Sequence, residues 1–174
     1  PKDAKVNKSN DLLNDIFEFF KSRFENDIDF AKDSVAGVLS TGIDDMYDAY
    51  LKIEAIDAFR KKNEELFSNL LLVFKRVKNM IKSAKEVNLD ESLLKEEAEK
   101  SLYNIYKEKL NEVNKLMEKR EYEKTFALLA SLYEPLDKFF KDIRVNVDDE
   151  HIKINRIALL SSVDKIFKNM LDFS

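Results

Sequence analysis

Glycine and proline are scarce in this chain, which contains two of each among its 174 residues. Average usage is about 7% for glycine and about 5% for proline. Hairpins and many-stranded sheets need these residues, because they supply the backbone conformations of tight turns. The composition therefore predicts an all-α fold in which nearly every residue belongs to a helix or a short connection.

Apolar residues recur at steps of three and four, most clearly between Leu102 and Met117. This spacing places them on one face of a helix. Eight helices are expected. The first four run from Ser9 or Asn10 to Phe24, from an Asp33 cap to Gly42, from Asp44 or Asp45 to Phe59, and from an Asn63 cap to Ile81. The other four are a longest helix that follows the polar loop 86–92 with its Asp90 cap, and helices over 121–133, Pro135 to Phe140, and 154–170. With no internal repeat or flexible linker, residues 1–174 are expected to form a single bundle of about seven to eight helices.

Several absences narrow the class of protein. The chain has no cysteine, so it has no disulfide and no thiolate metal site. It has no run of ~18 apolar residues and no layout of a signal peptide at its N-terminus. We therefore expect a soluble cytoplasmic protein with no membrane partner. Because the sequence begins at Pro1, we also expect it to be a piece of a longer chain.

The charge is unevenly distributed, although the net charge is −4. No acidic residue occurs from Leu66 to Lys85. The candidate side chains for contact with a phosphate backbone in this segment are Lys75, Arg76, Lys78, Asn79 and Lys82. Positions 75, 78 and 82 fall on one side of a helix. The alternative is an ordinary solvated helix face.

A second candidate lies between Phe139 and Leu160. Arginine binds phosphates or stacks on bases, and asparagine binds base edges. The candidate residues are Phe140, Arg144, Asn155 and Arg156. Alternatively, the arginines pair with nearby acids. Phe139 and Phe140 point about 100° apart on a helix, so one ring can be an exposed stacking surface, although burial of both is the simplest expectation.

Enzymatic sites are poorly supported. His151 is the only histidine, and we expect it at the surface or at a helix cap. Asp44, Asp45 and Asp48 could hold a divalent cation, but acids in a first helical turn are favoured by the helix dipole without a metal. No nucleophile elbow or glycine-rich phosphate loop is present. No catalytic residue and no metal ligand is therefore assigned.

Short segments along the chain carry a resemblance to a known family. They occur in the following order: Leu39–Asp45, Lys52–Ile56, Phe59–Arg60, Phe74–Lys82, Asp90–Leu93, Ala98–Tyr103, Tyr122–Lys124, Leu128–Leu132 and Asp172–Ser174. Together they resemble the C-terminal anticodon-binding domain of the bacterial glycyl-tRNA synthetase beta subunit, a helical domain of the class Ia-like, DALR type. Asp164–Phe167 stands where that family has its Asp-Ala-Leu-Arg signature, so the tetrapeptide itself is absent.

The resemblance implies a non-catalytic, C-terminal tRNA-binding domain of a glycine-tRNA ligase. The implied partners are glycine tRNA, the remainder of the beta subunit and the alpha subunit. ATP and magnesium are expected on the alpha subunit, and no cofactor is expected in this domain. Two rival functions remain at this point: a helical protein-protein interaction module with no RNA role, and a small helical hydrolase.

Overall fold

A computed structural model describes residues 15, 18–19, 21–23, 30–42, 45–82 and 88–172. In this part of the chain there are seven α-helices, one short 3₁₀ turn and no strand, which confirms the all-α class. Most of the helix expected to end at Phe24 lies outside the described residues, and the few described positions there are helical. None of the described helices is long and apolar enough to cross a membrane.

The elements follow one another with short connections. They are α2 (Lys32–Leu39), α3 (Met46–Lys62), α4 (Glu64–Ile81), the 3₁₀ turn η1 (Glu91–Leu93), α5 (Glu97–Glu118), α6 (Tyr122–Ala130), α7 (Tyr133–Asp142) and α8 (Glu150–Lys168).

One expected cap is confirmed, and another belongs to a different element. The carboxylate of Asp45 accepts the backbone N–H groups of Tyr47 at 2.9 Å and Asp48 at 3.4 Å, and α3 begins at the next residue. Asp90 accepts the N–H of Ser92 at 2.9 Å and caps η1, whereas the N-cap of the longest helix, α5, is Glu96 and not Asp90 as expected. Such bonds satisfy N–H groups that have no partner in the first turn of a helix.

Two expected helix starts differ from the structure, and at a third the capping bond is absent. Asp33 lies within the first turn of α2 and pairs with Arg60, so it is not the cap. Asn63 is the N-cap residue of α4 as expected, but its side chain makes no capping bond and donates to the carbonyl of Phe59 at 3.2 Å instead. Helix α8 begins four residues before Ile154, because Asp149 accepts N–H groups of the first turn.

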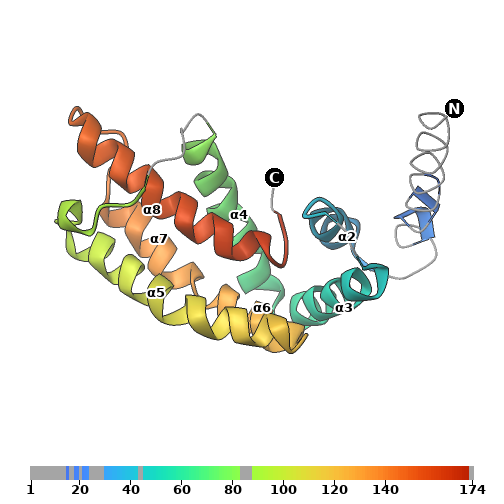
Figure 1. The fold of residues 1–174 in the computed structure, drawn as a ribbon. Coiled ribbons are helices and arrows are strands. Elements are labelled where there is room, and N and C mark those ends of the chain that lie inside the picture. The colour runs from blue at the N-terminus through green and yellow to red at the C-terminus, as the bar shows by residue number, and fades with distance from the viewer. Residues whose placement is uncertain are drawn as a thin grey trace, which may run out of the picture.

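The helices pack in layers around an apolar interior (Figure 1). Helices α7 and α8 each pack against both α4 and α5, so they separate those two helices. Helix α3 lies against α6 and α2, to the right of the block formed by α4 to α8 in Figure 1. Phe74 of α4 and Phe167 of α8 are buried with ring centroids 4.0 Å apart. This contact holds the inner face of α4 against the bundle and leaves its opposite face to solvent.

The C-terminal segment crosses α2 at a glycine. The N–H of Asp172 donates to the carbonyl of Gly37 at 3.0 Å. A Cβ atom at position 37 would lie 2.2 Å from Cδ1 of Leu171 and 3.0 Å from the carbonyl oxygen of Asp172. Glycine is therefore required here by close approach of two segments and not by its backbone angles.

Two buried polar residues of α8 connect distant parts of the chain. The side chain of Asn155 bonds the backbone of Asp90 twice, accepting its N–H at 2.8 Å and donating to its carbonyl at 2.9 Å. Arg156 forms an ion pair with Glu99 of α5 and donates to the carbonyl of Arg144 at 2.9 Å. Glu99, which is 1% exposed, also accepts the N–H groups that precede α5.

Replacing Arg156 with alanine should lower the free energy of unfolding by about 3–5 kcal/mol, because Glu99 would keep a buried charge without its partner. Urea denaturation checks this value. The control is Lys153→Ala on the same helix, which removes an ion pair to an exposed Glu150 and should change stability by less than about 1 kcal/mol. Equal effects of the two changes would contradict the described burial of Arg156.

Gly37→Ala should cost roughly 1–3 kcal/mol through overpacking against Leu171. In a double-mutant cycle with Leu171→Ala, the two effects should not add, because the smaller side chain makes room for the new methyl group. Thermal unfolding of the four proteins measures this coupling. Strict additivity would show that the C-terminal segment does not pack on α2 at this point.

Candidate nucleic-acid interface

The solvent-exposed face of α4 carries three of the predicted RNA-contacting residues. Lys75, Asn79 and Lys82 are all exposed. At about 100° per residue, they fall within roughly 60° of one another around the helix axis. Arg76, also exposed, lies at the edge of this stripe that faces α7. We refer to Lys75, Arg76, Asn79 and Lys82 as the α4 basic face.

Lys78 lies at the other edge of the stripe, toward α8. Its ammonium is 3.0 Å from Asp164 and 2.6 Å from Asp172, and its side chain is 17% exposed. Partial burial by itself would lower the pKa of Lys78, but the hydrogen bonds to Asp172 and Asp164 outweigh it and raise that pKa. Positions 75, 78 and 82 share one side of α4 as expected, but the choice of Lys78 as a phosphate contact is corrected, because its ammonium holds the C-terminal segment and α8 against α4.

Phe140 is buried beneath the α4 basic face. It is 6% exposed, and Phe139 is fully buried, so both rings belong to the core. Burial of both rings, the simplest expectation, is therefore confirmed, and the choice of Phe140 as an exposed stacking ring is wrong. The guanidinium of Arg76 covers the ring of Phe140, with its central carbon 4.3 Å from the ring centroid.

The remaining candidates divide into one exposed residue and two buried ones. Arg144 is exposed in the connection between α7 and α8. Asn155 and Arg156 are 4% and 8% exposed, and their polar groups bind Asp90, Glu99 and the carbonyl of Arg144. Since these side chains are engaged inside the protein, the structure does not bring them together with the α4 basic face. Arg156 instead holds the backbone of Arg144 in place.

Sequence reasoning missed Glu99, the residue that organises this junction. Its signal is the spacing of Glu96 and Glu99 before an apolar helical pattern, which is typical of a helix start. Nothing in that spacing indicates Arg156 as the partner, because the two residues are 57 positions apart.

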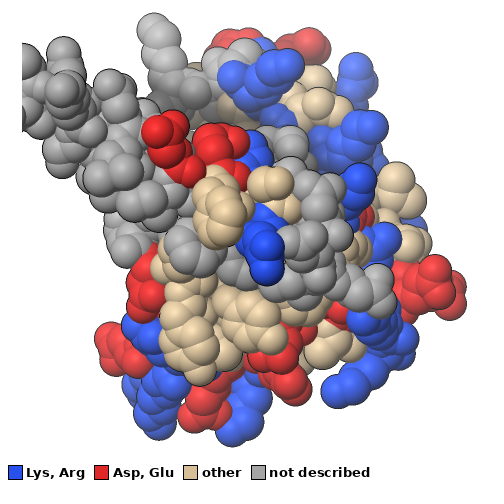
Figure 2. All heavy atoms as spheres, turned by 90° about the vertical axis from the view of Figure 1, so that its right-hand side faces the viewer, with Lys and Arg blue, Asp and Glu red and all other residues tan. Residues whose placement is uncertain are grey.

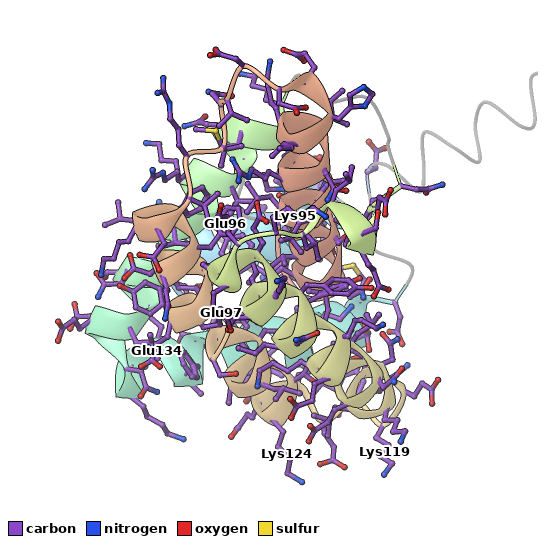
Figure 3. All side chains as sticks on the ribbon, turned by 90° about the vertical axis from the view of Figure 1, so that its left-hand side faces the viewer. Lys95, Glu96, Glu97, Lys119, Lys124 and Glu134 are labelled. Atoms are coloured by element: carbon purple, nitrogen blue, oxygen red, sulfur yellow. The ribbon has the colours of Figure 1, made fainter. Side chains whose placement is uncertain are left out.

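The α4 basic face has no acidic partner among the described residues, as Lys75, Arg76 and Lys82 form no ion pair there. Elsewhere cations are commonly neutralised, as Lys52 is by Asp48 at 3.0 Å. In Figure 2, Lys and Arg predominate along the right-hand margin of the view while acidic residues are scattered. Figure 3 shows that both signs of charge mix near the ends of α5, where Lys95 neighbours Glu96 and Glu97.

The acidic residues at the start of α3 have protein partners. Arg120 lies 3.0 Å from Asp45 and 3.4 Å from Asp48, and Tyr122 donates its hydroxyl to Asp48. Asp44 lies outside the described residues. Within the described ranges, no group of three or more His, Asp or Glu side chains could hold a metal ion. His151 is exposed in the first turn of α8, as expected.

Three known proteins similar to this chain share one description. It is 34% identical over 168 residues to the glycine–tRNA ligase beta subunit of Geotalea daltonii, a match that covers 95% of this chain and 24% of the relative. It is 35% identical to the beta subunits of Syntrophus aciditrophicus and Desulforamulus reducens, over 92% and 95% of this chain and 23% and 24% of those relatives. The chain thus spans about a quarter of the length of the curated relatives it matches.

A family match coincides with the part of the fold that carries the α4 basic face. Residues 59–173 match the DALR anticodon binding domain, and this range contains α4 to α8 together with the last turn of α3. The matched range is well over half of the 174 residues. The chain therefore belongs to the DALR anticodon binding domain family.

Proposed function

We propose that this chain binds the anticodon arm of glycine tRNA as part of a glycine-tRNA ligase beta subunit. The observation that carries the proposal is the α4 basic face: it is exposed, it lacks acidic partners among the described residues, and it belongs to the segment that matches an anticodon-binding family. The similarity to glycine–tRNA ligase beta subunits supports the choice of tRNA.

Electrostatic attraction to phosphates is the main physical basis of the proposed binding. Lys75 and Lys82 lie about two helical turns apart, roughly 10 Å along α4, so they can contact separate phosphates of one strand. Each neutralised phosphate releases bound counterions, and this release makes the affinity strongly dependent on salt. Arg144, exposed in the connection after α7, is a further candidate for contact with a phosphate. The acids elsewhere on the chain would repel RNA and so favour one orientation.

The proposed role leaves the bond-making chemistry to another part of the enzyme. We assign adenylation and aminoacyl transfer, with ATP and magnesium, to the alpha subunit in the cytoplasm. The remainder of the beta subunit would connect this domain to that subunit. Binding of the anticodon arm here would then test the identity of the tRNA and orient its acceptor end.

A protein-protein interaction module is less well supported. Such a module needs an apolar stripe or groove on its surface. The large apolar side chains exposed in the described residues are Phe19, Tyr47, Leu72 and Ile154, and each belongs to a different segment. This scattered arrangement provides no continuous apolar face along one helix.

Base recognition can be tested by titrating the chain with a hairpin that carries the glycine anticodon and with one whose anticodon bases are changed. The hairpin with the glycine anticodon should bind more tightly, by about 1–3 kcal/mol for each base that the chain recognises. Fluorescence anisotropy at fixed salt measures both affinities. Equal affinities would contradict recognition of the anticodon.

Contact with phosphates can be tested by replacing both Lys75 and Lys82 with alanine. Loss of two phosphate contacts should flatten the slope of log affinity against log salt concentration by about 2. The matched control removes Lys119 and Lys95, two exposed lysines near opposite ends of α5 (Figure 3). That control changes the net charge equally, so an identical slope in both variants would rule out a local phosphate contact on α4.

A further inference from the structure

A planar cation covers an aromatic ring at the edge of the α4 basic face. The guanidinium of Arg76 lies over the ring of Phe140, 4.3 Å from its centroid, at the contact between α4 and α7. Phe140 is buried and packs edge-to-face on Phe139, with centroids 5.6 Å apart. The ring is thus fixed by the core, and it in turn restricts the arginine that rests on it.

The opposite side of the guanidinium is available to a ligand. Arg76 is an exposed residue even though one side of its cationic group is covered by Phe140. No carboxylate among the described residues pairs with it, whereas Arg60, Arg120 and Arg156 all form ion pairs. A guanidinium is flat, delocalised and weakly hydrated, so its free face stacks well on aromatic rings.

The neighbours of Arg76 suit a nucleic-acid base better than a protein ring. Lys75 adjoins it and can bind the phosphate of the same nucleotide. Asn79 lies one turn further along the helix and presents an amide donor and acceptor suited to a base edge. Lys75, Arg76 and Asn79 together therefore suit a nucleotide, which has a phosphate beside a flat base. Single-stranded RNA is bound by stacking on flat groups and by cations along its backbone.

Other flat groups on the described surface are less suited to this role. Tyr47 and Phe19 are 63% and 59% exposed, but neither lies on α4 or α7. Tyr47 stands between the carboxylates of Asp45 and Asp48, which repel phosphate. Arg76, unlike Tyr47, combines exposure with a basic surrounding.

We propose that Arg76, held flat by Phe140, is a stacking platform for one unpaired base of the bound RNA. This inference rests on the proposed function, and it specifies that the Arg76 edge of the α4 basic face binds a base of the anticodon loop. The stacking role of Arg76 requires the ring of Phe140 to be buried. An exposed ring would stack on the base in place of Arg76 and would leave the arginine free to move.

The test separates stacking from charge by using Arg76→Lys, which keeps the positive charge and loses the plane. The RNA probes are the glycine anticodon hairpin and a set in which each loop nucleotide in turn is abasic, which keeps every phosphate. Wild-type affinity should fall on the order of tenfold when one particular base is removed. The Arg76→Lys variant should bind the intact hairpin about as weakly and should not respond to loss of that base.

A second variant tests the support from the ring. Phe140→Leu keeps an apolar side chain in the core but removes the surface on which the guanidinium lies. It should lose a similar factor on the intact hairpin and nothing on the hairpin that lacks the stacked base, with thermal unfolding used to confirm that it is folded. Full affinity in this folded variant would overturn the role of Phe140.

The outcomes distinguish this inference from the proposed function. If the wild-type chain binds the hairpin and Arg76→Lys binds it equally well, or loses the same factor on every abasic hairpin, the platform is overturned while anticodon-arm binding stands. If the wild-type chain binds none of the hairpins, the proposed function fails and the platform fails with it.

Discussion

The buried ion pair between Arg156 and Glu99 is the contact on which the arrangement of the α5–α8 half depends. Glu99 satisfies N–H groups at the start of α5, and Arg156 reaches from α8 both to Glu99 and to the carbonyl of Arg144. A buried pair adds little stability compared with apolar residues of the same size, but losing one partner is costly. The pair therefore specifies one arrangement of these segments, and it determines where Arg144 emerges at the surface.

The distribution of charge matters more here than its total. A net charge of −4 argues against attraction of RNA by the whole molecule. Some acids on other elements are paired with neighbouring cations, such as Asp48 with Lys52 and Asp57 with Lys61. Lys78 of α4 and Lys168 of α8 together offset the charges of Asp164 and Asp172, so these carboxylates oppose the cations on the outer face of α4 less strongly. Lys78 thus contributes to the interface indirectly, because it reduces the negative charge close to the α4 basic face.

Arg76 and Phe140 show how burial changes the chemical role of a residue. A ring beside an arginine-rich segment suggests a surface for stacking, yet the ring lies in the core and the arginine covers it. The buried ring thereby restricts the conformations of a cation at the surface. A guanidinium that rests on a fixed ring has fewer conformations to lose when a ligand binds. The same core that holds α4 against α7 and α8 determines how the basic face is presented.

The sequence by itself determined the helical class, the location of most helices and the basic segment of α4. These follow from local rules: apolar spacing, capping by Asp45, and the scarcity of glycine and proline. It could not determine the partners of Lys78, Asn155 and Arg156, because helical periodicity places a residue on a face but does not say which distant segment meets that face. Only the tertiary structure decided that Lys78 faces two carboxylates, that Asn155 and Arg156 are buried, and that Phe140 lies beneath Arg76. The physical reason is that these contacts join residues far apart in the chain, so they form only when the helices pack together.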